Sequence, residues 1–340
     1  MSRRIFTSLG APLAVLSMML VAVVTAGGQA PAAGKNGPAP KKAASKWTAP
    51  RTAWGDPDLQ GTWNNGTITP LERAREAGEK ELLSKEEEAE VNQQSDTRAE
   101  RRPADRSQDL DLAYDQFWWD RGASIGRTSL IIDPREGRLP PLTPDGQKML
   151  DARAAARRTR GPADSWVDRP LQERCILYHG VPPLPTGYNN NYEIAQAPGL
   201  VAILHEEIHE VRSIHLDGRP HLGASVRQWL GDSLGHWEGD TLVVETTNFH
   251  EDATFRFPAD AATLRVVERF RRVGRNAVDY QFTVDNPTMY TRPWTATLPM
   301  RKSDGLIYEY ACHEGNYGIA NVLSGHRAQE KEEAAKKDRK

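Results

Sequence analysis

The chain has 340 residues, of which 38% are hydrophobic and 26% charged, and its formal net charge is −2 at pH 7. This length allows one large or two small folded domains with a sizeable core. A charge balance so close to neutrality excludes the global basic field that draws a protein to nucleic acid. We therefore expect a folded protein with a polar surface and no nucleic-acid partner.

The N-terminal segment has the three parts of an export signal. Arg3 and Arg4 precede an apolar run over residues 11–24, and small residues follow up to Ala26. The arginine pair resembles the twin-arginine export motif, and an ordinary secretory signal stays open as the alternative. We predict a signal peptide over residues 1–26 and a periplasmic or secreted protein. The apolar run is shorter than the ~20 residues that span a bilayer, so we expect no stable membrane insertion.

Composition divides the rest of the chain into four parts. Residues 27–50 are rich in Ala, Pro, Gly and Lys, which predicts a flexible linker. Residues 51–160 form an irregular and helical N-terminal part. Residues 161–326 form an antiparallel β domain that is expected to make one globular unit with the preceding part. Residues 327–340 are charged throughout and are expected to be a solvated tail.

Two helices have clear start signals in the N-terminal part. Ser84 and Glu87, three residues apart, fit a capping box for a highly charged helix over 84–100. Thr143 is predicted to cap a second helix over 144–158, whose first residue is a proline.

Strand-like segments dominate the chain beyond these helices. The predicted strands cover 127–133, 192–197, 200–208, 210–216, 225–230, 241–249, 263–272, 278–285, 291–300 and 306–313. Short spacers with Gly, Asn or Asp separate many of them, which indicates antiparallel neighbours. No βαβ alternation occurs, which disfavours a nucleotide-binding α/β fold. We predict a mainly β fold, an antiparallel meander closing into a barrel-like sheet, with the N-terminal helical region packed on or beside it.

Alternation along these strands predicts the residues that face the interior. Three charged residues fall on apolar faces, namely Glu268, Arg292 and Glu206. Inward charges are costly unless they are paired or lie in a wet cavity. One explanation is a structural Glu–Arg ion pair or a β-bulge. The other is a polar spot in a ligand cavity, where Glu268 or Glu206 acts as acid or base with Arg292 as electrostatic partner.

The segment His-Glu-Glu-Ile-His at 205–209 matches the H-E-x-x-H signature of zinc peptidases. That motif binds zinc only on a helix, where both imidazoles lie on one face. The flanking apolar runs favour a strand, in which His205 and His209 lie roughly 13 Å apart, too far to share a metal. A zinc hydrolase that uses both histidines, with Glu206 as base, stays an alternative that requires a helix over 203–212.

The chain has two cysteines, Cys175 and Cys312. In an oxidising compartment an even pair suggests a disulfide, and two buried free thiols remain the alternative. His313 follows Cys312 directly. Together with His221 and His236, it belongs to a set of loop histidines for which two roles stay open: convergence at a barrel mouth, where sites tend to lie, or separate surface and capping roles.

Four segments together resemble a family of uncharacterised exported bacterial proteins. They are GDPDLQGTW at 55–63, LDGRPH at 216–221, WEGDTLVVETTNF at 237–249 and VVERF at 266–270. The resemblance covers roughly residues 54–326. It implies export and a single domain of similar length, and it transfers no catalytic residue.

Three functions are compatible with these patterns. The first is an exported barrel that binds a small, partly apolar molecule and acts on it by acid–base chemistry. The second is the zinc hydrolase, and the third is a non-catalytic envelope protein that uses the charged helix and tail as contact surfaces. No cofactor is favoured for the first. Its ligand cavity would be lined by Tyr280, Phe282, Trp294, Tyr308, Tyr310 and His313, and plain core packing stays open as the alternative role of the aromatic residues.

Overall fold

The computed structural model describes residues 47–100, 120, 122–208 and 210–339. The part of the chain that starts at Trp47 forms one compact unit. The predicted signal peptide and all but the last four residues of the predicted linker lie outside the described residues. No helix among the described residues is long and apolar enough to cross a bilayer.

The described residues contain eleven strands and three α-helices. The strands are β1 (Gly61–Asn64), β2 (Ile131–Asp133), β3 (Asn191–Ala197), β4 (Leu200–His205), β5 (Val211–His215), β6 (Asp232–Glu238), β7 (Thr241–Thr247), β8 (Arg265–Gly274), β9 (Ala277–Asp285), β10 (Trp294–Thr297) and β11 (Met300–Lys302). The helices are α1 (Lys85–Glu100), α2 (Pro144–Arg158) and α3 (Gly318–Lys337), with short 3-10 turns at Arg75–Ala77 and Trp166–Asp168.

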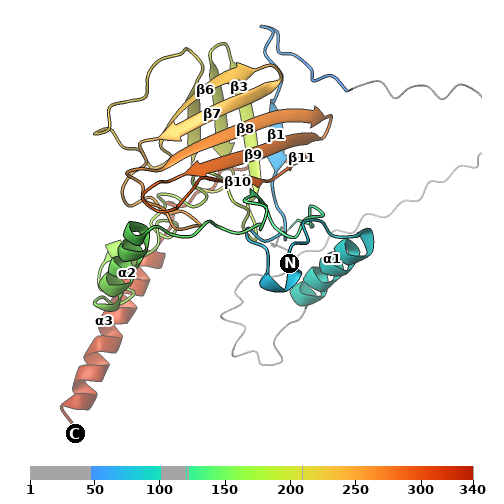
Figure 1. Ribbon diagram of the computed structural model, residues 1–340. Coiled ribbons are helices and arrows are strands. Elements are labelled where there is room, and N and C mark those ends of the chain that lie inside the picture. Colours follow the sequence, from blue (N-terminus) through green and yellow to red (C-terminus); the bar gives the residue numbers. More distant parts are fainter. Residues whose placement is uncertain (1–46, 101–119, 121, 209, 340) are drawn as a thin grey trace, which may run out of the picture. The chain divides into compact units, whose positions relative to one another are not determined.

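Nine of the described strands close into a barrel in the order β1, β3, β4, β5, β6, β7, β8, β9, β11 (Figure 1). Closure depends on β11, which pairs with β9 on one edge and with β1 on the other. β10 continues along the other half of β9, and β2 pairs with β10. The mainly β, barrel-like fold predicted from the sequence is confirmed.

One junction departs from the predicted antiparallel meander. β5 and β6 run parallel, with Ile214 opposite Ser233. Parallel neighbours need a crossover connection, which the loop over 216–231 supplies. The predicted strand at 225–230 is wrong, because that segment belongs to the crossover and its Gln228 makes only an isolated bridge.

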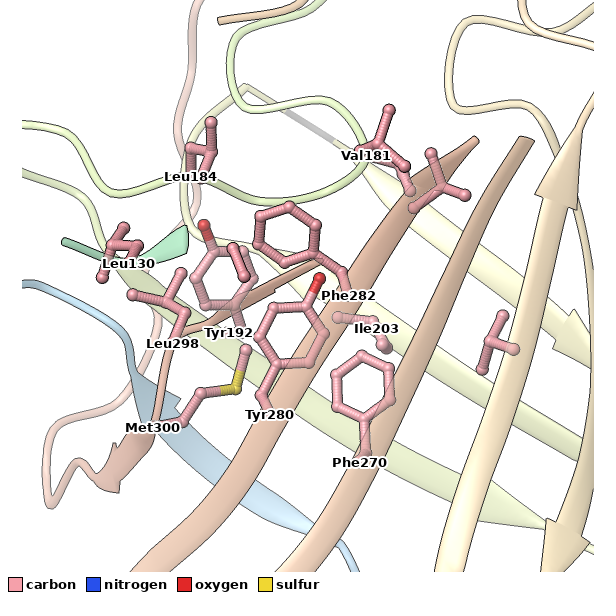
Figure 2. Close-up of a cluster of buried hydrophobic side chains, with 14 of the residues drawn as sticks. Leu130, Val181, Leu184, Tyr192, Ile203, Phe270, Tyr280, Phe282, Leu298 and Met300 are labelled. Atoms are coloured by element: carbon pink, nitrogen blue, oxygen red, sulfur yellow. The ribbon is translucent and has the colours of Figure 1, made fainter. Parts of the chain in front are cut away.

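Alternation directs one face of β8 and β9 into the barrel, as predicted. Along β9, the inward residues Val278, Tyr280, Phe282 and Val284 are at most 1% exposed. The Phe270 ring of β8 lies 4.6 Å from that of Tyr280, measured between centroids. Figure 2 shows these rings in one cluster with Tyr192 from β3 and Met300 from β11. Side chains from several strands therefore fill the interior.

The predicted strand at 291–300 divides into β10 and β11, with Pro299 between them. Proline has no backbone N–H for the strand ladder, which explains the break. Arg292 precedes β10, is half exposed, and pairs with Asp133 at 2.7 Å. The prediction that Arg292 faces the interior is wrong, because the residue lies in a turn where strand alternation does not apply.

The segment over 306–313 forms no strand, which corrects a second prediction. Leu306 and Tyr308 are 77% and 79% exposed, so the alternating pattern does not mark a buried face here. Because both edges of β11 are already paired, no barrel edge is free beside it for a further strand to join.

The two predicted helix starts are confirmed. The Ser84 hydroxyl accepts from the Glu87 backbone N–H at 3.2 Å, and the Glu87 carboxylate accepts from the Ser84 backbone N–H at 2.7 Å. The Thr143 hydroxyl accepts from Gly146 N–H at 2.9 Å. The predicted tail begins inside α3, which has no buried residue, so it is a solvated helix rather than an unstructured end.

Candidate functional site

A buried polar cluster lies inside the barrel. The Arg212 guanidinium of β5 forms a bidentate ion pair with Glu268 of β8, and its Nη1 lies 3.0 Å from Oε1. Arg212 also donates to the hydroxyls of Ser233 and Thr246, both at 2.9 Å. The Tyr280 hydroxyl donates to Glu268 Oε1 at 2.8 Å. The pair is at most 2% exposed, so both charges carry a desolvation penalty. The hydrogen bonds to the two charged groups offset much of that penalty.

These contacts give Glu268 a structural role. The predicted inward position of Glu268 is correct, but its partner is Arg212 and not Arg292. Tyr280 and Trp294, which were predicted to line a ligand cavity, are both fully buried in the core. The acid–base site predicted around Glu268 therefore has no access from solvent.

A second polar group lies where β4 turns into β5, at one end of the barrel. The His205 backbone N–H donates to the Glu210 carbonyl at 2.9 Å, so the two residues face each other across the hairpin. Their side chains are buried on one face, with His205 Nδ1 2.8 Å from Glu210 Oε2. Burial alone would raise the pKa of Glu210, but the contacts with His205 and the Tyr178 N–H lower it on balance.

This hairpin rules out the helix that the zinc signature requires. Residues up to His205 are strand, and β5 begins at Val211. Ile208 in the turn has φ +58°, a left-handed conformation that β-branched residues rarely adopt. The described residues therefore contain no helix over 203–212 of the kind that the zinc-hydrolase alternative requires, and strands flank the turn as the sequence favoured; His209 lies outside the described residues.

The predicted inner face of β4 is also wrong. Val201, Ile203 and His205 point inward and are buried, whereas Glu206 is only partly buried. Glu206 Oε2 accepts from the backbone and side-chain nitrogens of Asn191 at 3.1 and 2.7 Å. The pattern misled because both faces of β4 are apolar, so alternation could not identify the inward one.

His179 joins the hairpin from the long loop before β3. It is 3% exposed, and its ring lies 6.0 Å from that of His205, at 83° to it. Neither of its nitrogens has a hydrogen-bond partner among the described residues. Burial lowers the pKa of His179 to about 3, and the neighbouring His205 acts in the same direction, so the imidazole is neutral.

Glu207 is a further buried carboxyl in the same turn. It is 0% exposed, and its Oε1 accepts from Gln172 Nε2 at 3.2 Å. Burial raises the pKa of Glu207 to about 7, and the hydrogen bond from Gln172 offsets only part of that shift.

A pocket of about 230 Å³ opens beside this turn, between the end of β4 and the segment over 307–314. It gathers six residues that the sequence analysis singled out, together with apolar neighbours such as Ile208 and Ile307. Those six are His205, Glu206, Tyr308, Tyr310, Cys312 and His313. The sequence thus identified much of the lining, although it predicted a different arrangement.

A disulfide between Cys175 and Cys312 holds the 307–314 segment against the loop before β3. The Cα atoms are 5.7 Å apart and 137 residues apart in sequence. Asn316 Nδ2 adds a contact to Cys175 Sγ at 3.3 Å. Because this segment forms no strand, the disulfide is a main attachment of the pocket wall that Tyr308 and Tyr310 supply.

The predicted convergence of loop histidines is not observed. His221 Nδ1 lies 2.8 Å from an Asp232 oxygen, and His236 Nε2 lies 3.3 Å from Glu238. Neither histidine lines the pocket that contains His313.

Sequence reasoning missed Arg212, His179, Glu207 and Glu210 as site residues. Arg212 alternates with the apolar Ile214 in a recognised strand, so an inward charge could have been found there. His179 lies in an irregular loop, where no periodic pattern reports orientation. Its position depends wholly on tertiary packing.

Comparison with known proteins adds no assignment. No protein-family model, curated protein or solved structure matches this chain. The functional argument therefore rests on the residues of the barrel end.

Proposed function

We propose that this chain is an exported protein that binds a small, partly apolar molecule in the pocket beside the β4–β5 turn. The observation that carries the proposal is the composition of that pocket, where Tyr308, Tyr310 and Ile208 lie beside Glu206 and His313. Apolar walls with a few polar groups are typical of small-molecule sites. The volume is below the roughly 300–1,000 Å³ usual for drug-sized ligands, which favours a small molecule.

Charge narrows the class of ligand. Within the part of the chain that the structure describes, the lining includes the carboxyl residues Glu206, Glu309 and Glu314 and no lysine or arginine. An anion would meet like charges there, so the proposed ligand is neutral or cationic.

Glu206 is our proposed polar contact for the ligand. Among the described residues Asn191 hydrogen-bonds Oε2 of Glu206, and we propose that Oε1 accepts a hydrogen bond from a bound molecule. Of the three charged residues predicted for acid–base chemistry, Glu206 alone lines this pocket. If the bound molecule is also transformed, we propose Glu206 as the group that exchanges the proton.

Export is part of the proposal for two reasons. The first 26 residues have the pattern of a signal peptide. A disulfide that closes a long loop is typical of proteins that work in an oxidising compartment. Fractionation of producing cells tests this part. An uncleaved chain that stays in the cytoplasm would contradict it.

Dye binding tests the pocket. The probes are the neutral dye N-phenyl-1-naphthylamine and the anionic dye 1-anilinonaphthalene-8-sulfonate, each titrated into the full chain. We expect the neutral dye to bind more tightly. A Tyr308→Ala, Tyr310→Ala double variant should lose at least about tenfold in affinity, because stacking and apolar contacts are removed. Tyr317→Ala is the matched control, since that tyrosine is exposed and does not line the pocket. Equal binding by all three proteins would refute the site.

A further inference from the structure

We propose that His179, His205 and Glu210 form a binding site for a divalent transition metal, with Zn²⁺ as the best match to the ligands. The three residues come from the loop before β3, the end of β4 and the start of the β5 hairpin arm. The inference goes beyond the proposed ligand pocket and does not depend on it, because metal binding requires no occupant of that pocket.

The geometry is that of a compact ligand set. Each residue offers one ligand atom, and these atoms lie within 4.8 Å of one another. His179, His205 and Glu210 are 3%, 1% and 4% exposed, so the ligand set is almost entirely buried. Small rearrangements of the side chains would place each of the three ligand atoms ~2.0–2.2 Å from a shared zinc ion, which is the usual distance for nitrogen and carboxylate ligands.

The state of His179 points to a ligand. A buried polar atom in a folded protein almost always has a hydrogen-bond partner, and an exception calls for an explanation such as a bound ion. Both nitrogens of His179 lack a partner among the described residues. The His205–Glu210 contact by itself is explained as a buried hydrogen bond, but that reading leaves His179 unexplained. A metal shared by the three residues would give one of the two His179 nitrogens a partner and would also use the facing His205 and Glu210 atoms.

The surrounding contacts hold the ligands in place. The Tyr178 backbone N–H donates to Glu210 Oε1, which leaves Oε2 to face His205. The Tyr192 ring lies edge-on to both imidazoles, with centroids 4.8 Å from that of His205 and 5.7 Å from that of His179. The hydrogen bond from Tyr178 is an outer contact of the kind that orients metal ligands and commonly affects metal affinity by 10–100-fold.

The chemistry of the ligands favours zinc over the common hard cations. Calcium and magnesium prefer sets made of oxygen atoms, whereas two imidazoles and one carboxylate suit zinc and related transition metals. Two histidines with one glutamate leave a fourth coordination position open, as in catalytic zinc sites. This set differs from the H-E-x-x-H pair, because His179 is distant in sequence and Glu210 is outside that motif.

Metal content tests the proposal directly. The full chain is purified without chelator and without a histidine tag, and metals are measured by mass spectrometry. We expect about one equivalent of zinc in the wild type and at least about a tenfold loss in His179→Gln, His205→Gln and Glu210→Gln. His326→Gln is the matched control, because His326 of α3 belongs to a more exposed group with Glu330 of the same helix and Asp164 from the segment after α2. Retention of zinc in His179→Gln, or its loss in His326→Gln, would overturn the assignment.

A second measurement keeps the test independent of how the variants fold. Wild-type protein is stripped with chelator, and its Tm is followed as Zn²⁺, Co²⁺, Ca²⁺ or Mg²⁺ is added. Binding to the folded state alone raises Tm with metal concentration. We expect a rise with Zn²⁺ and Co²⁺ and none with Ca²⁺ or Mg²⁺. No rise with any transition metal in the stripped wild type would overturn the proposal, whatever the variants do.

Discussion

Arg212 and Glu268 form a bidentate ion pair inside the barrel although their strands, β5 and β8, are not neighbours. The pair reaches across β6 and β7, and each of these strands contributes one hydroxyl to it, from Ser233 and Thr246. β5 and β6 are also the strands that meet in parallel. The pair therefore links β5, on one side of the parallel junction, to β8, two strands beyond the other side.

Breaking this pair should destabilise the protein strongly. Glu268→Gln leaves the Arg212 charge buried without its counter-ion, which costs about 3–5 kcal/mol in comparable pairs. Urea unfolding of the variant measures the free energy of unfolding. The exposed pair Arg265–Glu245 provides the control, and Glu245→Gln should change the free energy of unfolding by less than about 1 kcal/mol.

Replacing both charges distinguishes pairing from burial. An Arg212→Met, Glu268→Leu double variant removes the ion pair without leaving a lone charge, so it should recover most of the loss of the single variant. A double variant that is less stable than Glu268→Gln would show that the hydrogen bonds of the cluster matter more than its charges.

Glu207 should make the stability of the metal-free protein depend on pH. Burial raises its folded pKa to about 7 from an ordinary 4.5, so the folded state holds the proton more tightly than the unfolded state. This contribution is complete below pH 4.5 and is lost as the pH rises to about 7. Between these two pH values the wild type should lose at most about 3 kcal/mol of unfolding free energy through Glu207, and Glu207→Gln should not show that loss.

The difference between wild type and Glu207→Gln is the quantity to measure across this range. The pKa of His179, about 3, lies below its ordinary value, so its contribution changes in the opposite direction, growing as the pH rises toward 6.5. Both proteins contain His179, so subtracting the pH profile of the variant from that of the wild type removes the His179 contribution. Glu314→Gln, at an exposed residue, should show no such difference. An identical pH profile for Glu207→Gln and wild type would contradict the prediction.

Reducing the disulfide should release the pocket wall before it unfolds the barrel. In the chain-entropy model a cross-link over 137 residues contributes at most about 5 kcal/mol, and release of an exposed segment in the folded state offsets part of that. Hydrogen exchange over 303–317 should rise at least tenfold, by our rough expectation for a freed segment, while β8 and β9 stay protected. A Cys175→Ser, Cys312→Ser variant should behave like the reduced protein and respond to no reductant.

Gly235, beside the parallel junction, has too little space around it for a side chain. A Cβ at this position would lie 2.8 Å from methyl groups of Ile214 and Leu216. Gly235→Ala therefore overpacks the core and should destabilise the protein by about 1–3 kcal/mol. Gly223→Ala is the control, since nothing lies within 4 Å of the added methyl group and its backbone is not left-handed. Thermal unfolding of both variants decides the matter.

Local patterns were reliable where neighbouring residues set the structure. The caps at Ser84 and Thr143 depend on bonds within one helical turn, so the sequence predicted them correctly. The inward faces of β8 and β9 were also correct, since polar residues mark their other side. The prediction failed for β4, because apolar residues occupy both of its faces.

By itself, the sequence determined the mainly β class, the barrel-like closure and half of the residues that line the pocket, because hydrophobic alternation and turn residues act over short distances. Only the tertiary structure decided the partners of the buried groups. Arg212 meets Glu268 across two intervening strands, and His179 reaches His205 and Glu210 from a loop without periodicity. Such contacts follow from how a closed sheet brings distant segments together, and no local pattern encodes them.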